Sequence, residues 1–87
     1  MYRVELSKKV QKKQLKKIKN AGLAKNFDAI LTELINNPFS NKQGFEKLQP
    51  PVKNWFSRRL NIQHRVVYHI DKESKTVFID SAWQHYE

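Results

Sequence analysis

The sequence has no cysteine, few acidic residues and no long apolar run. Without cysteine the chain forms no disulfide and no thiolate metal site, and its three histidines, at positions 64, 69 and 85, match no usual zinc spacing. We therefore expect neither a metal nor another cofactor. No apolar stretch approaches the roughly 20 residues of a membrane span, and the N-terminus lacks the apolar core of a signal peptide. These absences predict a soluble, cytosolic protein that does not enter membranes.

The shortage of acidic residues leaves the chain strongly basic. The 17 Lys and Arg residues outnumber the 8 Asp and Glu residues, and the formal net charge is +9. This surplus favours a polyanionic partner, and nucleic acid is a better match than a membrane surface. The 87 residues contain no repeat or low-complexity segment and form one domain, residues 1–87. A domain this small would gain stability from a partner or from homodimer formation, and the sequence leaves both monomer and dimer open.

The N-terminal half reads as a strand followed by two helices. Residues 2–6 alternate apolar and polar side chains, as a half-buried strand does. Ser7 occupies the N-cap position of a helix over residues 8–19, and Gly22 separates this helix from a second one over residues 24–36. The first helix has a narrow apolar arc, consisting of Val10, Leu15, Ile18 and Ala21. The second has apolar residues at i, i+3, i+4, i+7 and i+8: Phe27, Ile30, Leu31, Leu34 and Ile35.

The C-terminal half reads as strands separated by turns. A short alternating run at residues 45–48 is consistent with a brief strand. Longer strand patterns follow at residues 55–60, 63–70 and 76–83, with a polar turn at 71–75. Three consecutive strands predict an antiparallel meander. The class is therefore α+β with the order β-α-α-β-β-β, in which a helical hairpin packs on one face of a mainly antiparallel, twisted sheet.

Three arginines lie within the first two of these strand patterns. An unpaired charge inside a sheet is costly, so Arg58, Arg59 and Arg65 are expected to line a surface that meets anions, with phosphate as the first candidate. Adjacent residues of a regular strand face opposite sides, so Arg58 and Arg59 cannot serve the same pocket. We predict Arg59 and Arg65 as the phosphate ligands and Arg58 as a supporting residue. The alternative is that the arginines form structural salt bridges with Glu46, Asp71 or Asp80.

The first predicted helix is a second basic feature. Seven lysines and no acidic residue lie between positions 8 and 19. Lysine is a flexible point charge suited to diffuse attraction of a phosphate backbone, whereas the fork of arginine holds a phosphate in one geometry. This contrast predicts docking through the helix and chemistry on the sheet, although a solvated helix face would have the same composition. The candidate RNA-contacting residues are Lys8, Lys9, Lys12, Lys13, Lys16, Lys47 and Arg58.

Four segments together resemble the YoeB/Txe family of bacterial toxins, within the RelE superfamily. They are Phe45-Glu46-Lys47-Leu48, Trp55-Phe56-Ser57-Arg58-Arg59-Leu60, His64-Arg65-Val66-Val67-Tyr68 and Trp83-Gln84-His85-Tyr86. The resemblance implies a RelE-like fold and a ribosome-dependent mRNA endonuclease that inhibits translation in the bacterial cytoplasm. It also implies a YefM-like antitoxin that silences the toxin, in a complex that binds operator DNA. The chain departs from the family pattern at Gln49, Trp83, Gln84 and Glu87.

The active residues of that family carry over onto Glu46, Arg59, Arg65, His85 and Tyr86. Metal-free RNA cleavage must withdraw a proton from the ribose 2′-OH, stabilise charge on the phosphate and protonate the leaving oxygen. Glu46 is the candidate base, the arginines stabilise the phosphate, and His85 is the candidate acid because histidine titrates near neutral pH. Tyr86 would stack on a base or bond to a phosphate.

Two other functions remain open at this point. A non-catalytic module that binds RNA or the ribosome would use the same lysines and aromatic residues without needing Glu46 or His85. A RelE-fold relative that poisons DNA gyrase is a third reading, against which the retained Glu46, Arg65 and His85-Tyr86 set argues.

Overall fold

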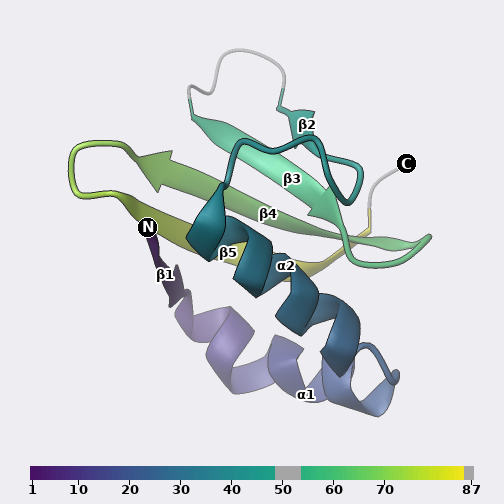
Figure 1. Cartoon of the computed structure of the whole chain (residues 1–87). Helices are drawn as coiled ribbons and strands as arrows, with labels where there is room; N and C mark the ends of the chain where they lie inside the picture. The colour runs from purple at the N-terminus through teal and green to yellow at the C-terminus, as the bar shows by residue number, and fades with distance from the viewer. Residues whose placement is uncertain (49–53, 86–87) are drawn as a thin grey trace.

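The computed structural model describes residues 1–48 and 54–85, without the side chains of residues 84 and 85. Two helical segments lie on one side of a five-stranded sheet (Figure 1). In chain order, the elements are β1 (Arg3–Leu6), the π-helical turn η1 (Val10–Gln14), α1 (Leu15–Asn20), α2 (Ala24–Asn36), β2 (Glu46–Lys47), β3 (Trp55–Arg59), β4 (His64–Asp71) and β5 (Thr76–His85). The α+β class is confirmed, as is an order in which one strand and two helices precede the other strands. The brief strand at residues 45–48 is present as β2, so four strands follow the helices and not the three of the predicted order.

The sheet has the strand order β1-β5-β4-β3-β2. Strands β3 to β5 form the predicted antiparallel meander, because β3 pairs with β4 and β4 with β5 in antiparallel register. Strand β2 extends it by a fourth strand, since β2 pairs antiparallel with β3. Strand β1 runs parallel to β5 at the other edge, where Val4 pairs with Val77. The two helices therefore form the connection that carries the chain from β1 across to the rest of the sheet.

The first helical segment begins and ends close to the predicted positions. The Ser7 hydroxyl accepts a hydrogen bond from the Val10 N–H at 3.3 Å, which confirms the N-cap. Gln14, at the end of η1, accepts a bond from the Ala82 N–H at 2.7 Å and thereby ties the turn to β5. The prediction for Ala21 is wrong, because this residue lies beyond the end of α1 and is exposed. Gly22 has a φ of 73°, as expected for a helix stop.

The hydrophobic core lies between the helices and the sheet. Phe27, Ile30 and Leu34 of α2 are buried, as their helical spacing predicts. They belong to one cluster with sheet residues that include Val66 and Ile79. A fully buried aliphatic or aromatic side chain contributes about 1.5–3 kcal/mol, so this face dominates the stability of the domain. In the described part of the chain, no helix combines the length and apolarity needed to cross a membrane.

Candidate active site

The sheet face opposite the helices gathers the predicted catalytic side chains of β2, β3 and β4. Glu46 pairs with Ser57, and Arg59 pairs with Arg65, so these four residues share one face. They line a cavity of about 200 Å³ together with Leu48, Ile62 and Gln63. The structure therefore brings together three of the residues that the sequence predicted for catalysis.

Arg65 is the fixed member of this group. Its Nε donates to the Ser57 hydroxyl at 2.9 Å, and its Nη2 donates to the Gly44 carbonyl. The same Nη2 lies 3.7 Å from Oε1 of Glu46. Its side chain is 8% exposed, whereas that of Glu46 is 63% exposed. The guanidinium is thus held by the protein, and the carboxylate stands at the mouth of the cavity.

Arg59 lies beside Arg65 but is exposed. Its backbone N–H donates to the Gln43 carbonyl at 2.7 Å, which fixes the strand against the preceding loop. Among residues 1–48 and 54–85, no carboxylate forms an ion pair with Arg59. The alternative of a structural salt bridge therefore applies to Arg65 with Glu46 and not to Arg59, which presents its charge to solvent. Asp80, another expected partner, pairs with His69 instead.

The loop before β2 packs directly against both arginines. Gln43 and Gly44 have positive φ values of 57° and 63°. A Cβ added at Gly44 would lie 3.3 Å from the Cβ of Arg59 and 3.8 Å from Nη2 of Arg65. Glycine is therefore needed at this position both for the left-handed backbone and for the close approach. The Gln43–Gly44 loop therefore limits the positions that the side chains of Arg59 and Arg65 can take.

Arg58 faces the helix side of the sheet and is completely buried. Its Nε donates to the Tyr68 hydroxyl at 2.9 Å, and its two terminal nitrogens donate to the carbonyls of Pro38, Ser40 and Lys42 at 2.9–3.0 Å. The opposite orientation of Arg58 and Arg59 is as predicted. The prediction that Arg58 contacts RNA is wrong, because its donors are used inside the protein and none of its surface is accessible.

Burial and this arginine also affect nearby titrating groups. Burial raises the pKa of the Tyr68 hydroxyl, because the charged phenolate is disfavoured away from water. The pKa of Glu33 is lowered, first by a hydrogen bond from Ser40 and further by the charges of Lys42 and Arg58. Glu33 also lies 3.6 Å from the Lys42 ammonium. The Pro38–Lys42 loop is therefore held from the sheet by Arg58 and from α2 by Glu33.

The predicted lysines lie away from the arginine cavity. Those between residues 8 and 16 are exposed on η1 and the residues around it, and η1 packs against β5. Lys47 of β2 pairs with Phe56 and lines a different hollow with Phe39 and Phe45. Because neighbouring residues of a strand alternate, Lys47 and Glu46 lie on opposite faces. Contact of these lysines with RNA stays a prediction.

The C-terminal candidates are placed by backbone register alone. His85 lies opposite His64, and Gln84 lies opposite Arg65. The end of β5 is therefore next to the part of β4 that carries Arg65. Tyr86 lies outside the described residues, as do Gln49 and Glu87.

Ser57 and Gly44 were not identified from the sequence as part of the site. Ser57 could have been found, because it stands two residues before Arg59 and therefore shares its face of the strand. Gly44 could be recognised as a turn residue, but its contact with both arginines depends on how the loop folds back on the sheet. A stacked group on the same face was also missed: His69 lies 4.7 Å from Trp55 and 4.9 Å from Phe78, ring centre to ring centre.

The comparisons with known proteins agree with this fold. The family model described as YoeB-like toxin of bacterial type II toxin-antitoxin system matches residues 8–86. Among solved structures, the YoeB dimer of Staphylococcus aureus is similar at 24% identity, with 98% of each chain covered and a TM-score of 0.81. The YoeB-YefM complex of Staphylococcus aureus matches at 25% identity, with 99% of each chain covered and a TM-score of 0.77.

A more distant similarity is to the DinJ-YafQ complex of Escherichia coli, at 17% identity and a TM-score of 0.78, covering 98% of this chain and 94% of the other. None of the curated proteins matches the chain. The family match spans nearly the whole sequence and includes every segment that carried the resemblance. The chain therefore belongs to the YoeB-like toxins of bacterial type II toxin-antitoxin systems.

Proposed function

We propose that this toxin is an endoribonuclease that cuts mRNA on the ribosome without a metal ion and so inhibits translation. The observation that carries the proposal is the cavity in which the exposed carboxylate of Glu46 stands beside the fixed guanidinium of Arg65 and the open one of Arg59. A base next to two phosphate-binding groups is what attack by a ribose 2′-OH requires.

In the proposed reaction, each of the predicted site residues has one role. Glu46 takes the proton of the 2′-OH, and the oxygen attacks the adjacent phosphorus. Arg59 and Arg65 stabilise the extra negative charge on the phosphate oxygens. The bond to the 5′-oxygen breaks, and His85 gives that oxygen a proton. The products are a 2′,3′-cyclic phosphate and a 5′-hydroxyl end, and Tyr86 is proposed to hold the RNA at the site.

The partners follow from the family and the charge. The Staphylococcus aureus YoeB-YefM complex supports a YefM-like antitoxin as a protein partner of this toxin. The antitoxin is proposed to silence the toxin, and the complex of the two is proposed to bind operator DNA. The Staphylococcus aureus YoeB dimer supports a homodimer as one state of the free toxin. A net charge of +9 favours ribosomal RNA and mRNA as the other partners, reached in the bacterial cytoplasm.

The test adds purified toxin to a translating system, with and without a chelator that binds transition metals but leaves the Mg²⁺ that ribosomes need, and maps the 5′ ends of the mRNA. The wild type should cut at ribosome-occupied codons, and Glu46→Gln and His85→Ala should remove the cuts. Glu73→Gln, which changes an exposed acid in the β4–β5 turn, is the matched control and should cut normally. Stalled translation with uncut mRNA would instead favour a module that only binds RNA, and damage to DNA by gyrase would favour a gyrase poison.

A further inference from the structure

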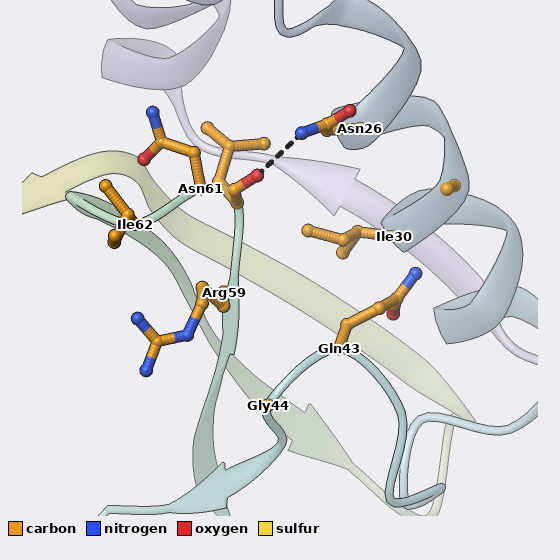
Figure 2. A pocket seen from close by; sticks show the side chains of 9 residues that line it. Asn26, Ile30, Gln43, Gly44, Arg59, Asn61 and Ile62 are labelled. Atoms are coloured by element: carbon orange, nitrogen blue, oxygen red, sulfur yellow. Dashed lines mark hydrogen bonds between the residues drawn. The ribbon is translucent and has the colours of Figure 1, made fainter.

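A second, larger cavity adjoins the arginine site on the side of α2. It measures about 440 Å³ and lies between α2 and the loop that joins β3 to β4 (Figure 2). Its lining comprises Asn26, Ala29, Ile30, Gln43, Gly44, Arg59, Leu60, Asn61 and Ile62. Arg59 and Ile62 line both cavities. A ligand held by Arg59 can therefore extend from the arginine site into this second cavity.

The second cavity combines an apolar floor with an amide rim. Ile30 and Leu60 are 1% and 2% exposed and form the floor. Asn26 reaches across from α2, and its Nδ2 donates to the Leu60 carbonyl at 3.0 Å (Figure 2). On the opposite side, Oε1 of Gln43 accepts a bond from Arg58 at 3.4 Å. Each carboxamide is thus anchored through one atom.

The other half of each amide remains for a ligand. Among the described residues, Oδ1 of Asn26 and Nε2 of Gln43 have no hydrogen-bond partner, so these two side chains offer one acceptor atom and one donor atom. A flat molecule with apolar faces and a polar edge fits such a surface. Nucleobases have this form, and proteins read splayed RNA bases by hydrogen bonds to their edges and by stacking on arginine.

The charge of the residues that line this cavity favours a nucleobase over an acidic peptide as its ligand. Arg59 is the one charged side chain among the residues that line this cavity. An acidic peptide would leave its further carboxylates without cations here, whereas a base needs none. The backbone bond of 2.7 Å from Arg59 to Gln43 also fixes this wall relative to the arginine site.

We propose that this cavity holds the nucleobase next to the cleaved phosphate and that Asn26 and Gln43 read its edge. The inference rests on the proposed ribonuclease function and adds to it a source of sequence preference. A phosphate bound between Arg59 and Arg65 would direct the neighbouring base over the side chains of Arg59 and Ile62 into the amide-rimmed cavity.

The first test fills the cavity. Ala29 is exposed on α2 and lines the cavity, so Ala29→Trp should occupy the space without disturbing the core. Thr32→Trp, at an exposed position of the same helix outside the lining, is the matched control. In mapped mRNA ends, the wild type and Thr32→Trp should share a base preference at one position beside the cut. Ala29→Trp should lose about tenfold or more of the cutting at preferred sites and flatten the preference.

Several outcomes would overturn the inference. The first is a wild-type cutting profile with no base preference, and the second is an Ala29→Trp profile like that of the wild type. The third is an Ala29→Trp protein that cuts normally but binds the antitoxin more weakly, which would assign the cavity to a peptide. Ala29→Leu serves in the same assay if circular dichroism shows that the tryptophan variant is unfolded. If the wild type cuts no RNA at all, the proposed function fails. A second measurement, which does not depend on cutting, then tests whether the cavity binds a nucleobase.

That measurement titrates the Glu46→Gln protein with the four nucleoside 5′-monophosphates and, separately, with inorganic phosphate. The side-chain amide signals of Asn26 and Gln43 are followed by NMR. At least one nucleotide should shift both signals, and phosphate alone should leave them in place. Equal shifts with phosphate alone, or none with any nucleotide, would contradict a base-binding cavity.

Discussion

Nη2 of Arg65 lies 3.7 Å from Oε1 of Glu46, although the arginine is buried and the glutamate is exposed. The contact is longer than a direct hydrogen bond, and the arginine spends its shorter bonds on Ser57 and Gly44. Arg65 is therefore oriented by the protein and not by the carboxylate. The side chain of Glu46 thus stays free to move, as its proposed role as the base requires, and Arg65 is fixed, as its proposed role as a phosphate ligand requires.

This arrangement predicts that arginine geometry matters at position 65 in addition to charge. Arg65→Lys keeps the charge but removes the fork that reaches Ser57 and Gly44 together, so the cation is no longer held toward the cavity. Cutting should fall by about 100-fold in a single-turnover assay. Arg3→Lys, at an exposed surface pair, should have no effect. Equal activity of Arg65→Lys and wild type would show that charge alone suffices.

The two glycines permit a matched test of the loop behind the site. Gly22 and Gly44 both have positive φ, but a Cβ at Gly22 would meet nothing within 4 Å, whereas one at Gly44 would press on Arg59. Alanine at either position should lower the free energy of unfolding by about 1–2 kcal/mol, because the left-handed backbone disfavours a side chain. Gly44→Ala alone should also reduce cutting. Denaturation in urea and end mapping separate the two effects, and equal cutting by both variants would rule out the close approach as important.

We expect acidic pH to destabilise the Pro38–Lys42 loop, because Glu33 becomes protonated. Its pKa is lower in the folded protein than the ordinary value of 4.5, mainly because Ser40 donates a hydrogen bond to the carboxylate. A group whose folded pKa is depressed adds stability above its unfolded pKa and loses that stability as the pH falls through the folded value. Glu33→Gln should therefore flatten the decline of stability below the ordinary pKa. Urea unfolding over an acidic pH series would show this, and Glu73→Gln provides the comparison; identical pH curves for wild type and Glu33→Gln would contradict it.

Local patterns predict much of this fold because they depend on neighbours in the sequence. The spacing of Phe27, Ile30 and Leu34 identifies the buried face of α2, and strand alternation separates Arg58 from Arg59. Distant contacts escape such patterns. Nothing near Arg58 in the sequence indicates that carbonyl groups 16 to 20 residues earlier would receive its hydrogen bonds.

The candidate site also has some parts that the sequence predicts and others that it does not. Glu46 and Arg65 were found through motifs that the family shares, and the register of β2, β3 and β4 then places them on one face. The cavity beside α2 depends on the distance between a helix and a loop that are remote in sequence, so the sequence alone does not reveal it. The sequence alone also does not reveal that β1 pairs in parallel with β5, because β1 could have paired with the strand at either edge of the meander.

The neighbouring arginines of β3 should respond oppositely to the same substitution. Arg58→Met removes the hydrogen bonds to the Tyr68 hydroxyl and to the carbonyls of Pro38, Ser40 and Lys42, so the free energy of unfolding should fall by about 3 kcal/mol or more. Pro38 and Lys42 keep a second donor, from the Tyr68 hydroxyl and the Phe45 N–H, whereas the Ser40 carbonyl has no other partner among the described residues. Arg59→Met removes an exposed charge and should change stability by less than about 0.5 kcal/mol. Cutting should be lost in Arg59→Met even though the protein stays folded.

Urea unfolding and end mapping at a temperature where both variants remain folded would measure the two properties separately. A stable Arg58→Met would show that the loop holds its place without the arginine, and an active Arg59→Met would remove this residue from phosphate binding. Since one side chain faces the core and the other the open face, stability should follow Arg58 and activity should follow Arg59.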